Sequence, residues 1–264
     1  MLKLSISNIA WDASYDAVMY DKMNDLGYKG LEIAPTRLFQ EQPYSHTNAA
    51  SQWAHNLRQT YDLSISSMQS IWYGRTECLF RSPAEREVLK KYTKKAIDFA
   101  SAIDCPNLVF GSPKNRNLIE GENPDSAISF FRELGEYAAA HGTVLSLEAN
   151  PAIYHTNYIN TTKEAIEIAK IVNSPGIRVN LDLGTVICNK EDLHCLQADM
   201  HWIHHIHISE PHLNPIECRD IHQTLKNILC RGYYGYLSIE MGKGLEIDNI
   251  YKIMEQVKEI YYEV

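Results

Sequence analysis

The sequence lacks a long hydrophobic run. No apolar stretch in its 264 residues approaches the length of about 18 residues that a membrane-spanning helix needs. The segment from Met1 to Asp12 contains one lysine and no apolar core followed by a small-residue cleavage site, so we expect no secretory signal. These absences predict a cytoplasmic protein with no membrane partner.

Clusters of basic residues are also lacking. The chain has 25 lysines and arginines against 33 aspartates and glutamates, a net charge of −8, and the basic residues are scattered. Proteins that bind nucleic-acid duplexes present a basic surface that neutralises phosphates. We therefore expect no nucleic-acid partner.

Paired cysteine motifs are missing. The six cysteines form no CxxC pair, and their spacing matches neither a zinc ribbon nor a disulfide framework. We expect free thiols in a reducing cytoplasm and assign none of them a function.

Glycine-rich phosphate-binding loops are absent. The segment Ile9–Ala17, which follows the first expected strand, contains no glycine, so the GxGxxG motif of dinucleotide-binding folds is not there. The pattern GxxxxGK[ST] is absent as well. An open, doubly wound sheet is therefore the weaker of two possible α/β architectures.

What is present is a strict alternation of short β-branched segments and longer amphipathic ones. This alternation predicts parallel strands joined by helical crossovers, and eight such units match the size of a (β/α)₈ barrel. We expect an α/β protein with a single TIM-barrel domain over residues 1–264. The expected strands are Leu2–Asn8, Gly30–Ala34, Leu63–Gln69, Asn107–Gly111, Thr143–Ala149, Gly176–Asp182, Ile203–Ser209 and Gly235–Glu240. The expected helices are Ser14–Leu26, Asn48–Tyr61, Pro83–Ala102, Pro124–His141, Thr161–Val172, Glu191–Met200, Asp220–Arg231 and Ile247–Val264.

Several helix ends carry sequence signals. Gly27 is expected just after the end of the first helix. Ser82 is expected to cap the third helix, with proline next and Glu85 completing a capping box. Asn123 and Pro124 open the following helix in the same way.

Chemically active side chains recur at the ends of the expected strands. They are Glu32, Glu148, Asp182, His207 and Glu240. Active sites of TIM barrels lie at these carboxyl ends, so the side chains are expected to meet at one mouth. A single glutamate at a strand end is often only solvated or a helix-start partner, and this alternative stays open for Glu32. Four such residues on consecutive strands argue against coincidence.

The last four of these residues predict a metal site. Three converging carboxylates without a cation would repel one another at low dielectric. Carboxylate oxygens with one imidazole suit Mn²⁺, Mg²⁺, Co²⁺ or Zn²⁺, and the set is too rich in oxygen for a structural zinc site.

The strings LEAN, LDLG, HIHISE and SIEM around these four residues carry a resemblance. The chain resembles the xylose-isomerase-like TIM-barrel superfamily, and within it the sugar phosphate isomerase/epimerase group with the ketose 3-epimerases of the D-tagatose 3-epimerase type. The resemblance covers the whole chain at the level of fold but is sharp only in these strings. It implies one divalent ion, foremost Mn²⁺, held by Glu148, Asp182, His207 and Glu240, with Glu148 and Glu240 as the acid/base pair.

The sequence also departs from that group. Thr185 stands where members often carry a histidine three residues after the aspartate. Tyr154 or His155 stands in place of an additional glutamate, and no arginine lies in SEPHLNP after the seventh strand. These departures put a free ketohexose substrate in doubt but leave the metal site intact.

Other candidate substrate contacts are Glu32, Trp72, Lys114, Arg116, Asn150 and Glu210. Lys114 and Arg116 are expected either to clamp an anion or to be a solvated charge pair. Trp72 is expected to stack on a sugar or to pack under a helix.

The expected chemistry is that of a sugar, sugar-phosphate or sugar-acid epimerase or isomerase. A metal-stabilised enediolate would let one glutamate remove a proton and the other return it on the opposite face. Dehydration of a keto-sugar or keto-cyclitol on the same scaffold is the alternative. An apurinic-site endonuclease and a non-catalytic sugar-binding barrel are less favoured. The expected partners are a small carbohydrate substrate and a second copy of the chain in a homodimer.

The segment His201–His212 holds five of the eleven histidines. Side chains on a strand alternate between its faces, so His205 and His207 are expected to point into the barrel. His207 is the expected ligand, and His205 needs a polar partner one layer lower. His204 is expected on the other face, with Ile206 and Ile208.

Overall fold

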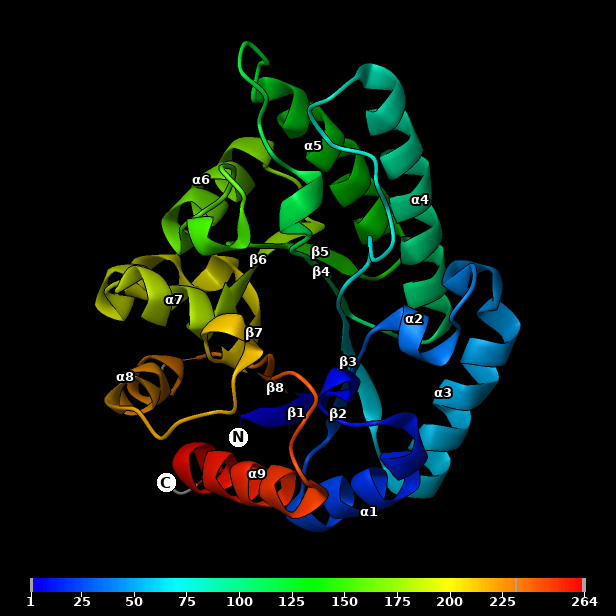
Figure 1. Cartoon of the computed structure of the whole chain (residues 1–264), viewed down its shortest axis with the longest axis vertical. Coiled ribbons are helices and arrows are strands. Elements are labelled where there is room, and N and C mark those ends of the chain that lie inside the picture. Colours follow the sequence, from blue (N-terminus) through cyan, green and yellow to red (C-terminus); the bar gives the residue numbers. More distant parts are fainter. Residues whose placement is uncertain (1, 231, 263–264) are drawn as a thin grey trace.

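The computed structural model describes residues 2–230 and 232–262, and its strands close into a barrel. The eight parallel strands follow one another in chain order, and β8 pairs with β1 (Figure 1). This confirms the predicted (β/α)₈ fold class. The strands are β1 Lys3–Ser7, β2 Gly30–Ile33, β3 Ser64–Met68, β4 Asn107–Phe110, β5 Val144–Glu148, β6 Ile177–Asp182, β7 Ile203–Ser209 and β8 Tyr236–Glu240.

The α-helices surround the barrel (Figure 1). Among the described residues they are α1 Asp16–Leu26, α2 Pro35–Leu38, α3 Thr47–Tyr61, α4 Pro83–Ala102, α5 Asp125–Ala140, α6 Thr162–Val172, α7 Leu183–Asn189, α8 Asp220–Leu229 and α9 Ile247–Tyr262. The 3₁₀ helices are η1 Asn8–Ala10, η2 Ala13–Tyr15, η3 Pro43–Ser45, η4 Pro113–Asn115, η5 Ala152–Tyr154, η6 Leu193–Trp202 and η7 Pro211–Leu213. The helix ends predicted at residue 231 and at residues 263–264 lie outside the described residues.

The predicted helix ends are largely as expected. Gly27 adopts a left-handed φ of 80° after α1, and the Ser82 hydroxyl accepts the amide of Glu85 at 3.1 Å. The reciprocal half of the capping box is wrong, because the Glu85 carboxylate accepts the amide of Cys78 at 2.7 Å instead.

The connection between β6 and β7 differs from the prediction in two elements. The expected helix over residues 191–200 is the 3₁₀ helix η6, and α7 begins directly after β6 without having been predicted. The Asp182 side chain caps α7 by accepting the amide of Thr185 at 2.6 Å. A cap that is also the last residue of a strand leaves no turn signal between the two elements.

The inside of the barrel is polar. Side chains from non-neighbouring strands bond across it, as in Ser5–Ser66 at 2.6 Å and Gln69–Ser7 at 3.0 Å. Outward-facing residues such as Leu4 and Ile6 are fully buried in the apolar layer beneath the helices. Interiors of TIM barrels are usually filled by branched aliphatic residues, so hydrogen bonds replace much of that packing here.

A β-bulge in β7 corrects the predicted direction of His204. Val179 pairs with Ile203 and Asn180 pairs with His205, so His204 is an extra residue on β7. Its Nδ1 lies 3.0 Å from Oδ1 of Asn107 on β4, across the barrel. His204 and His205 therefore both point inward, since a bulge interrupts the alternation of faces.

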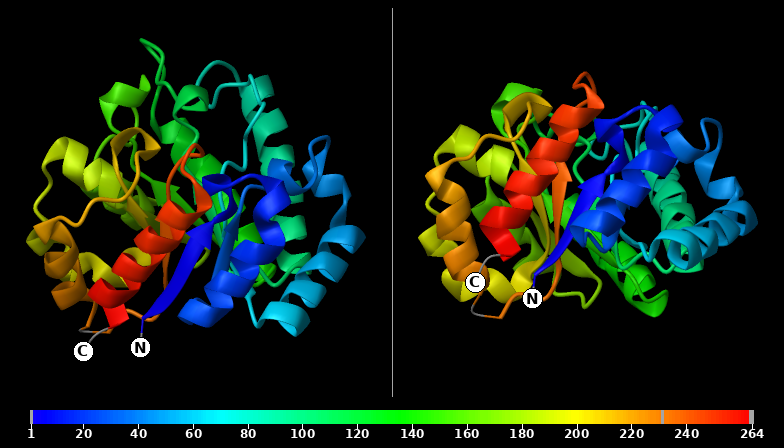
Figure 2. Two further views of the ribbon diagram at one scale, coloured as in Figure 1. Left: turned by 60° about the horizontal axis from the view of Figure 1, so that its bottom comes forward. Right: turned by 90° about the horizontal axis from the view of Figure 1, so that it is seen from below.

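The start of β1 and the end of α9 lie close together at one end of the barrel (Figure 2). The carboxyl ends of the strands form the other end, which we call the mouth. Within the described part of the chain, no helix combines the length and apolar character required to cross a membrane.

Candidate metal centre and active site

Four side chains from consecutive strands meet at the mouth. Glu148, Asp182, His207 and Glu240 end or nearly end β5 to β8, and each offers one ligand atom within 4.8 Å of the others. Nδ1 of His207 lies 3.0 Å from Glu148 Oε1, 3.1 Å from Glu240 Oε2 and 4.0 Å from Asp182 Oδ2. The structure thus brings together the four residues that the sequence singled out as metal ligands.

Amide side chains hold Glu148 in place. Asn180 Nδ2 donates to Oε1 at 2.7 Å, and Asn150 Nδ2 donates to Oε2 at 3.1 Å. The carboxylate also lies against Gly111, where an added Cβ would come within 2.5 Å of Oε2. Only glycine at the end of β4 leaves room for this carboxylate.

Asp182 is held by two further donors. Besides the Thr185 amide on Oδ1, the Ser209 hydroxyl donates to Oδ2 at 2.5 Å. Thr185, which replaces the histidine of the resembled group, donates its hydroxyl to the Ala149 carbonyl at 2.8 Å. Thr185 therefore braces the backbone between β5 and α7.

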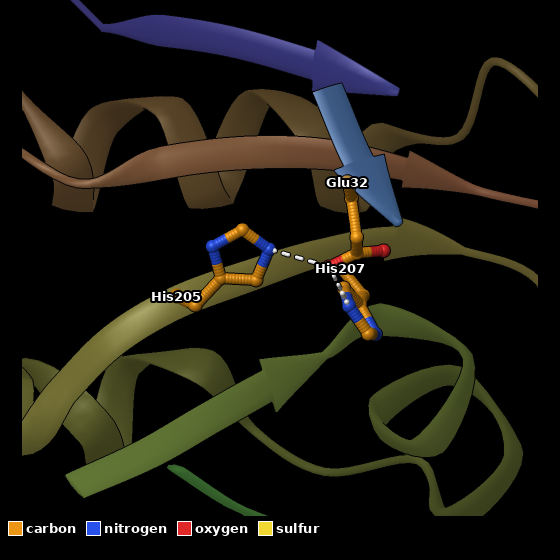
Figure 3. A group of neighbouring side chains, drawn as sticks. All are labelled: Glu32, His205 and His207. Carbon is orange, nitrogen blue, oxygen red and sulfur yellow. Dashed lines mark hydrogen bonds and ion pairs between the residues drawn. The ribbon is translucent and has the colours of Figure 1, made fainter. Parts of the chain in front are cut away.

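Glu32 sets the orientation of His207. Glu32 Oε2 lies 3.0 Å from Nε2 of His207 and 3.0 Å from Nε2 of His205 (Figure 3). All three side chains are at most 1% exposed. A proton on Nε2 of His207 that bonds to Glu32 leaves Nδ1 unprotonated, and this nitrogen faces the other three carboxylates and lies 3.1 Å from Nδ2 of Asn180. Such carboxylate–histidine pairs orient metal-bound imidazoles in proteins.

The buried charges shift one another's pKa values. Burial raises the pKa of Glu240 to about 7, although His207 opposes this shift. Burial and the Glu148 charge raise the pKa of Asp182 to about 6. Burial would also raise the pKa of Glu148, but His207 and Asn150 hold it below its usual value. The pKa of His207 is raised well above 6.5, because Glu240, Glu32 and Glu148 outweigh burial.

The donor set fits a divalent cation. Three buried carboxylates around one imidazole leave a net negative charge even when the imidazole is protonated, and a divalent ion would neutralise it. Carboxylate oxygens with one imidazole nitrogen suit Mn²⁺, Mg²⁺, Co²⁺ or Zn²⁺.

A cavity of about 200 Å³ opens above these residues. It is lined by Gln69, Ser70, Val109, Gly111, Ser112, Pro113, Glu148, Asn150, Tyr154, Asp182, Glu210, Leu213 and Glu240. Ser70, Ser112 and Leu213 have φ values of 54°, 45° and 55°, which are strained for residues other than glycine. The mouth is thus built on loops held in costly conformations by their surroundings.

Asn150 and Glu210 are the two predicted substrate contacts that do line the mouth cavity. Glu210 is 3% exposed and accepts Nε of Arg219 at 2.8 Å. Sequence reasoning missed this arginine because it lies beyond the SEPHLNP segment. It also missed Gln69, although this residue ends the third expected strand as the glutamates end theirs.

Trp72 does not reach the mouth, which corrects its assignment as a sugar-stacking residue. Its side chain is 2% exposed, packs edge-on against Phe110 and Phe130, and donates to the Thr93 hydroxyl at 2.8 Å. The packing alternative is therefore the observed one.

Arg116 is no free anion clamp. Its guanidinium is fully buried and donates to the carbonyl of Glu148 at 2.8 Å and to Asn150 Oδ1 at 2.8 Å. Lys114 is exposed and does not line the cavity. Glu32 is fully buried beneath His207, so it too is removed from any substrate.

A family model described as xylose isomerase-like TIM barrel matches residues 20–259. No sequence among the curated proteins matches the chain. Several solved structures share its fold at low identity, so the likeness to them concerns the fold alone.

D-Allulose 3-epimerase from Methylomonas sp., in complex with D-allulose, has a TM-score of 0.77 and 19% identity, covering 98% of this chain and 97% of its own. D-Psicose 3-epimerase from Clostridium cellulolyticum H10, with D-tagatose, has a TM-score of 0.73 and 17% identity, covering 98% and 96%. A family 2 AP endonuclease from Brucella melitensis has a TM-score of 0.69 and 19% identity, covering 93% and 95%.

Proposed function

The chain belongs to the xylose isomerase-like TIM-barrel family, and on that premise we propose that it is a divalent-metal-dependent epimerase or isomerase of a sugar, sugar phosphate or sugar acid. The observation that carries the proposal is the convergence of Glu148, Asp182, His207 and Glu240 at one mouth. The sugar 3-epimerases among the structural neighbours support the substrate class.

The proposed ligands of the ion are these four residues, with Mn²⁺ the first candidate. The ion, when bound, supplies Lewis-acid stabilisation of the negative charge that develops on the substrate oxygens during proton removal. His207 is oriented by Glu32 and Asp182 by Ser209, so the protein holds its ligands in place before the substrate arrives.

Glu148 and Glu240 are proposed to move the proton. They stand on β5 and β8, three strands apart around the barrel, and both line the mouth cavity. A substrate seated between them would have one carboxylate on each face. One carboxylate removes the proton α to the carbonyl and the other delivers a proton to the opposite face, which inverts the centre.

Turnover in D₂O tests this assignment. Glu148→Gln and Glu240→Gln are each expected to lower the epimerisation rate about 10²- to 10⁴-fold. Each variant should still exchange the α-proton of the one epimer that faces its remaining carboxylate. The exposed Glu217→Gln serves as the matched control and should retain wild-type turnover.

Metal content tests the same proposal separately. Purified protein should contain about one divalent ion per chain, and chelation should abolish a turnover that re-metallation restores. The proposal would be wrong if the purified protein contained no such ion and if chelation and re-metallation changed neither its activity nor its stability.

A dehydratase is the second candidate, because the sequence departs at Thr185 and Tyr154 from the pattern of the resembled epimerases, and Tyr154 lines the mouth cavity. A product lighter by one water in mass spectrometry would identify it. Cleavage of abasic duplex DNA would instead favour the endonuclease branch; the net charge of −8 argues against that branch.

The whole chain, residues 1–264, is proposed to fold as one domain and to form a homodimer in the cytoplasm. The cysteines are unpaired, which agrees with a reducing compartment. Light scattering of the purified protein tests the dimer.

A further inference from the structure

A second and larger cavity lies at the end of the barrel opposite the mouth. Its volume is about 990 Å³, against about 200 Å³ for the mouth cavity. The first residues of four strands line it, namely Lys3, Asn107, Ile203 and Tyr236. We call it the basal cavity. Its volume is at the upper end of the range of about 300–1,000 Å³ typical of small-molecule sites.

The floor of the basal cavity is made of polar side chains from the barrel interior. Ser66, Asn107, His204 and His205 reach it from inside the sheet. The bulge in β7 turns His204 toward this floor, where its Nδ1 bonds to Asn107 Oδ1 at 3.0 Å. The bulge thus adds a second imidazole to the floor of the cavity, where regular alternation would place only that of His205.

His205 presents a buried polar atom to the basal cavity. Its side chain is 1% exposed and its Nε2 bonds to Glu32 at 3.0 Å, while Nδ1 has no hydrogen-bond partner among the described residues. Figure 3 shows this second nitrogen turned away from Glu32, toward the starts of the strands. Because the ring proton lies on Nε2 toward Glu32, Nδ1 is a hydrogen-bond acceptor to which a hydroxyl group of a bound ligand would donate.

The wall and rim supply aromatic rings and positive charge. Tyr233, Tyr234 and Tyr236 line one side, and Tyr234 is 80% exposed at the rim. Lys3 stands at the same side, with its Nζ 5.4 Å from the centroid of the Tyr236 ring. No aspartate or glutamate occurs among the described residues that line the cavity, although the chain carries a net charge of −8. The mouth has the opposite character, since three glutamates and an aspartate line it.

We propose that the basal cavity is a second binding site, for a small organic anion that carries a ring. Tyrosine side chains pack on the faces of aromatic and sugar rings. Lys3 donates to a carboxylate or phosphate, and Nδ1 of His205 accepts a hydrogen bond from a hydroxyl group of the ligand. Four carboxylates line the mouth and none of the described residues lining the basal cavity is acidic, so the two ends of the barrel differ in charge. This proposal does not depend on the activity proposed for the mouth.

Matched probe pairs test the basal site by calorimetry. The probes are 4-hydroxybenzoate against 4-hydroxybenzamide, and fructose 6-phosphate against fructose, which separates an aromatic acid from a sugar phosphate as the source of the anion. At least one anion is expected to bind with a Kd below about 1 mM, about tenfold or more tighter than its neutral counterpart. Equal binding of both members of each pair, or no saturation by either anion, would overturn the proposal.

Variants of exposed residues locate the binding without disturbing the fold. Lys3→Met and Tyr234→Ala are each expected to weaken binding about three- to tenfold. Lys114→Met, an exposed lysine near the mouth, is the matched control and should change nothing. Binding that survives both basal variants but disappears in Glu240→Gln would assign the probe to the mouth and refute the basal site.

Discussion

The candidate metal site depends on a single residue, Glu32, that lies beneath it and touches no substrate. Its carboxylate accepts from Nε2 of both His205 and His207, and it is fully buried. Because one oxygen serves both imidazoles, loss of its charge would release His207 from its orientation toward the other carboxylates.

Glu32→Gln is therefore expected to lower the affinity for Mn²⁺ about 10- to 100-fold, measured by titration calorimetry. Glu210→Gln removes another buried carboxylate, one that bonds to Arg219 and not to the quartet, and should leave the affinity unchanged. Equal affinities in wild type and Glu32→Gln would show that His207 needs no such partner.

The affinity for the metal should depend steeply on pH. The pKa of Glu240 is raised to about 7 and that of Asp182 to about 6, so both carboxyls are largely protonated at pH 5. The raised pKa of His207 keeps its imidazole protonated as well. An ion can bind only after these groups lose protons, so affinity should rise from pH 5 to pH 8.

Calorimetry in buffers of different ionisation enthalpy measures the protons released, and more than one per bound ion is expected at pH 6. An affinity that does not change over this range would contradict the assignment of these groups as ligands.

Trp72 connects two elements, because its side chain holds the loop after β3 against α4. Trp72→Phe removes the bond to Thr93 and part of the contact with Phe110. We expect the free energy of unfolding to fall by about 1–3 kcal/mol in urea titrations, with kcat/KM unchanged. Tyr73 is 70% exposed, and Tyr73→Phe is the neutral control. A change confined to KM would return Trp72 to the substrate site.

Elements with local signals could be predicted from the sequence. Ser82 before a proline and Gly27 after an amphipathic segment report helix ends through contacts within a few residues. No such local signal marks the start of α7, because the residue that caps this helix is also the last residue of β6. The bulge at His204 depends on the pairing of β7 with β6, a contact that the local pattern does not encode.

The candidate site could likewise be predicted only in part. Glu148, Asp182, His207 and Glu240 were predictable because each ends or nearly ends a strand and parallel strand ends meet at one edge. The contact of Glu32 with His205 joins β2 to β7 across the barrel, and Arg116 folds back onto the carbonyl of Glu148. Such contacts depend on the three-dimensional path of the chain, so the sequence indicated the residues without their partners.

At the scale of the whole molecule, the bound ion should stabilise the fold. Mn²⁺ at about 100 times its Kd is expected to add about 2.7 kcal/mol to the free energy of unfolding. For a chain of this size, Tm should rise by about 5–10 °C, as scanning calorimetry would measure. Asp182→Asn should lose most of this gain, and an equal gain in that variant would place the stabilising ion elsewhere.

The polar interior of the barrel also bears on how the chain finds its fold. In a sheet that is apolar on both faces, a strand displaced by one residue still buries apolar side chains on each face. Here such a displacement of β1 would press Ser5 and Ser7 against the helices and turn Leu4 and Ile6 inward among hydroxyl groups. The same error in β2 would bury the Glu32 carboxylate in the apolar outer layer without its histidines. Each misaligned strand would therefore make the fold less stable. The polar side chains that position the groups of the mouth thus also favour the correct strand register.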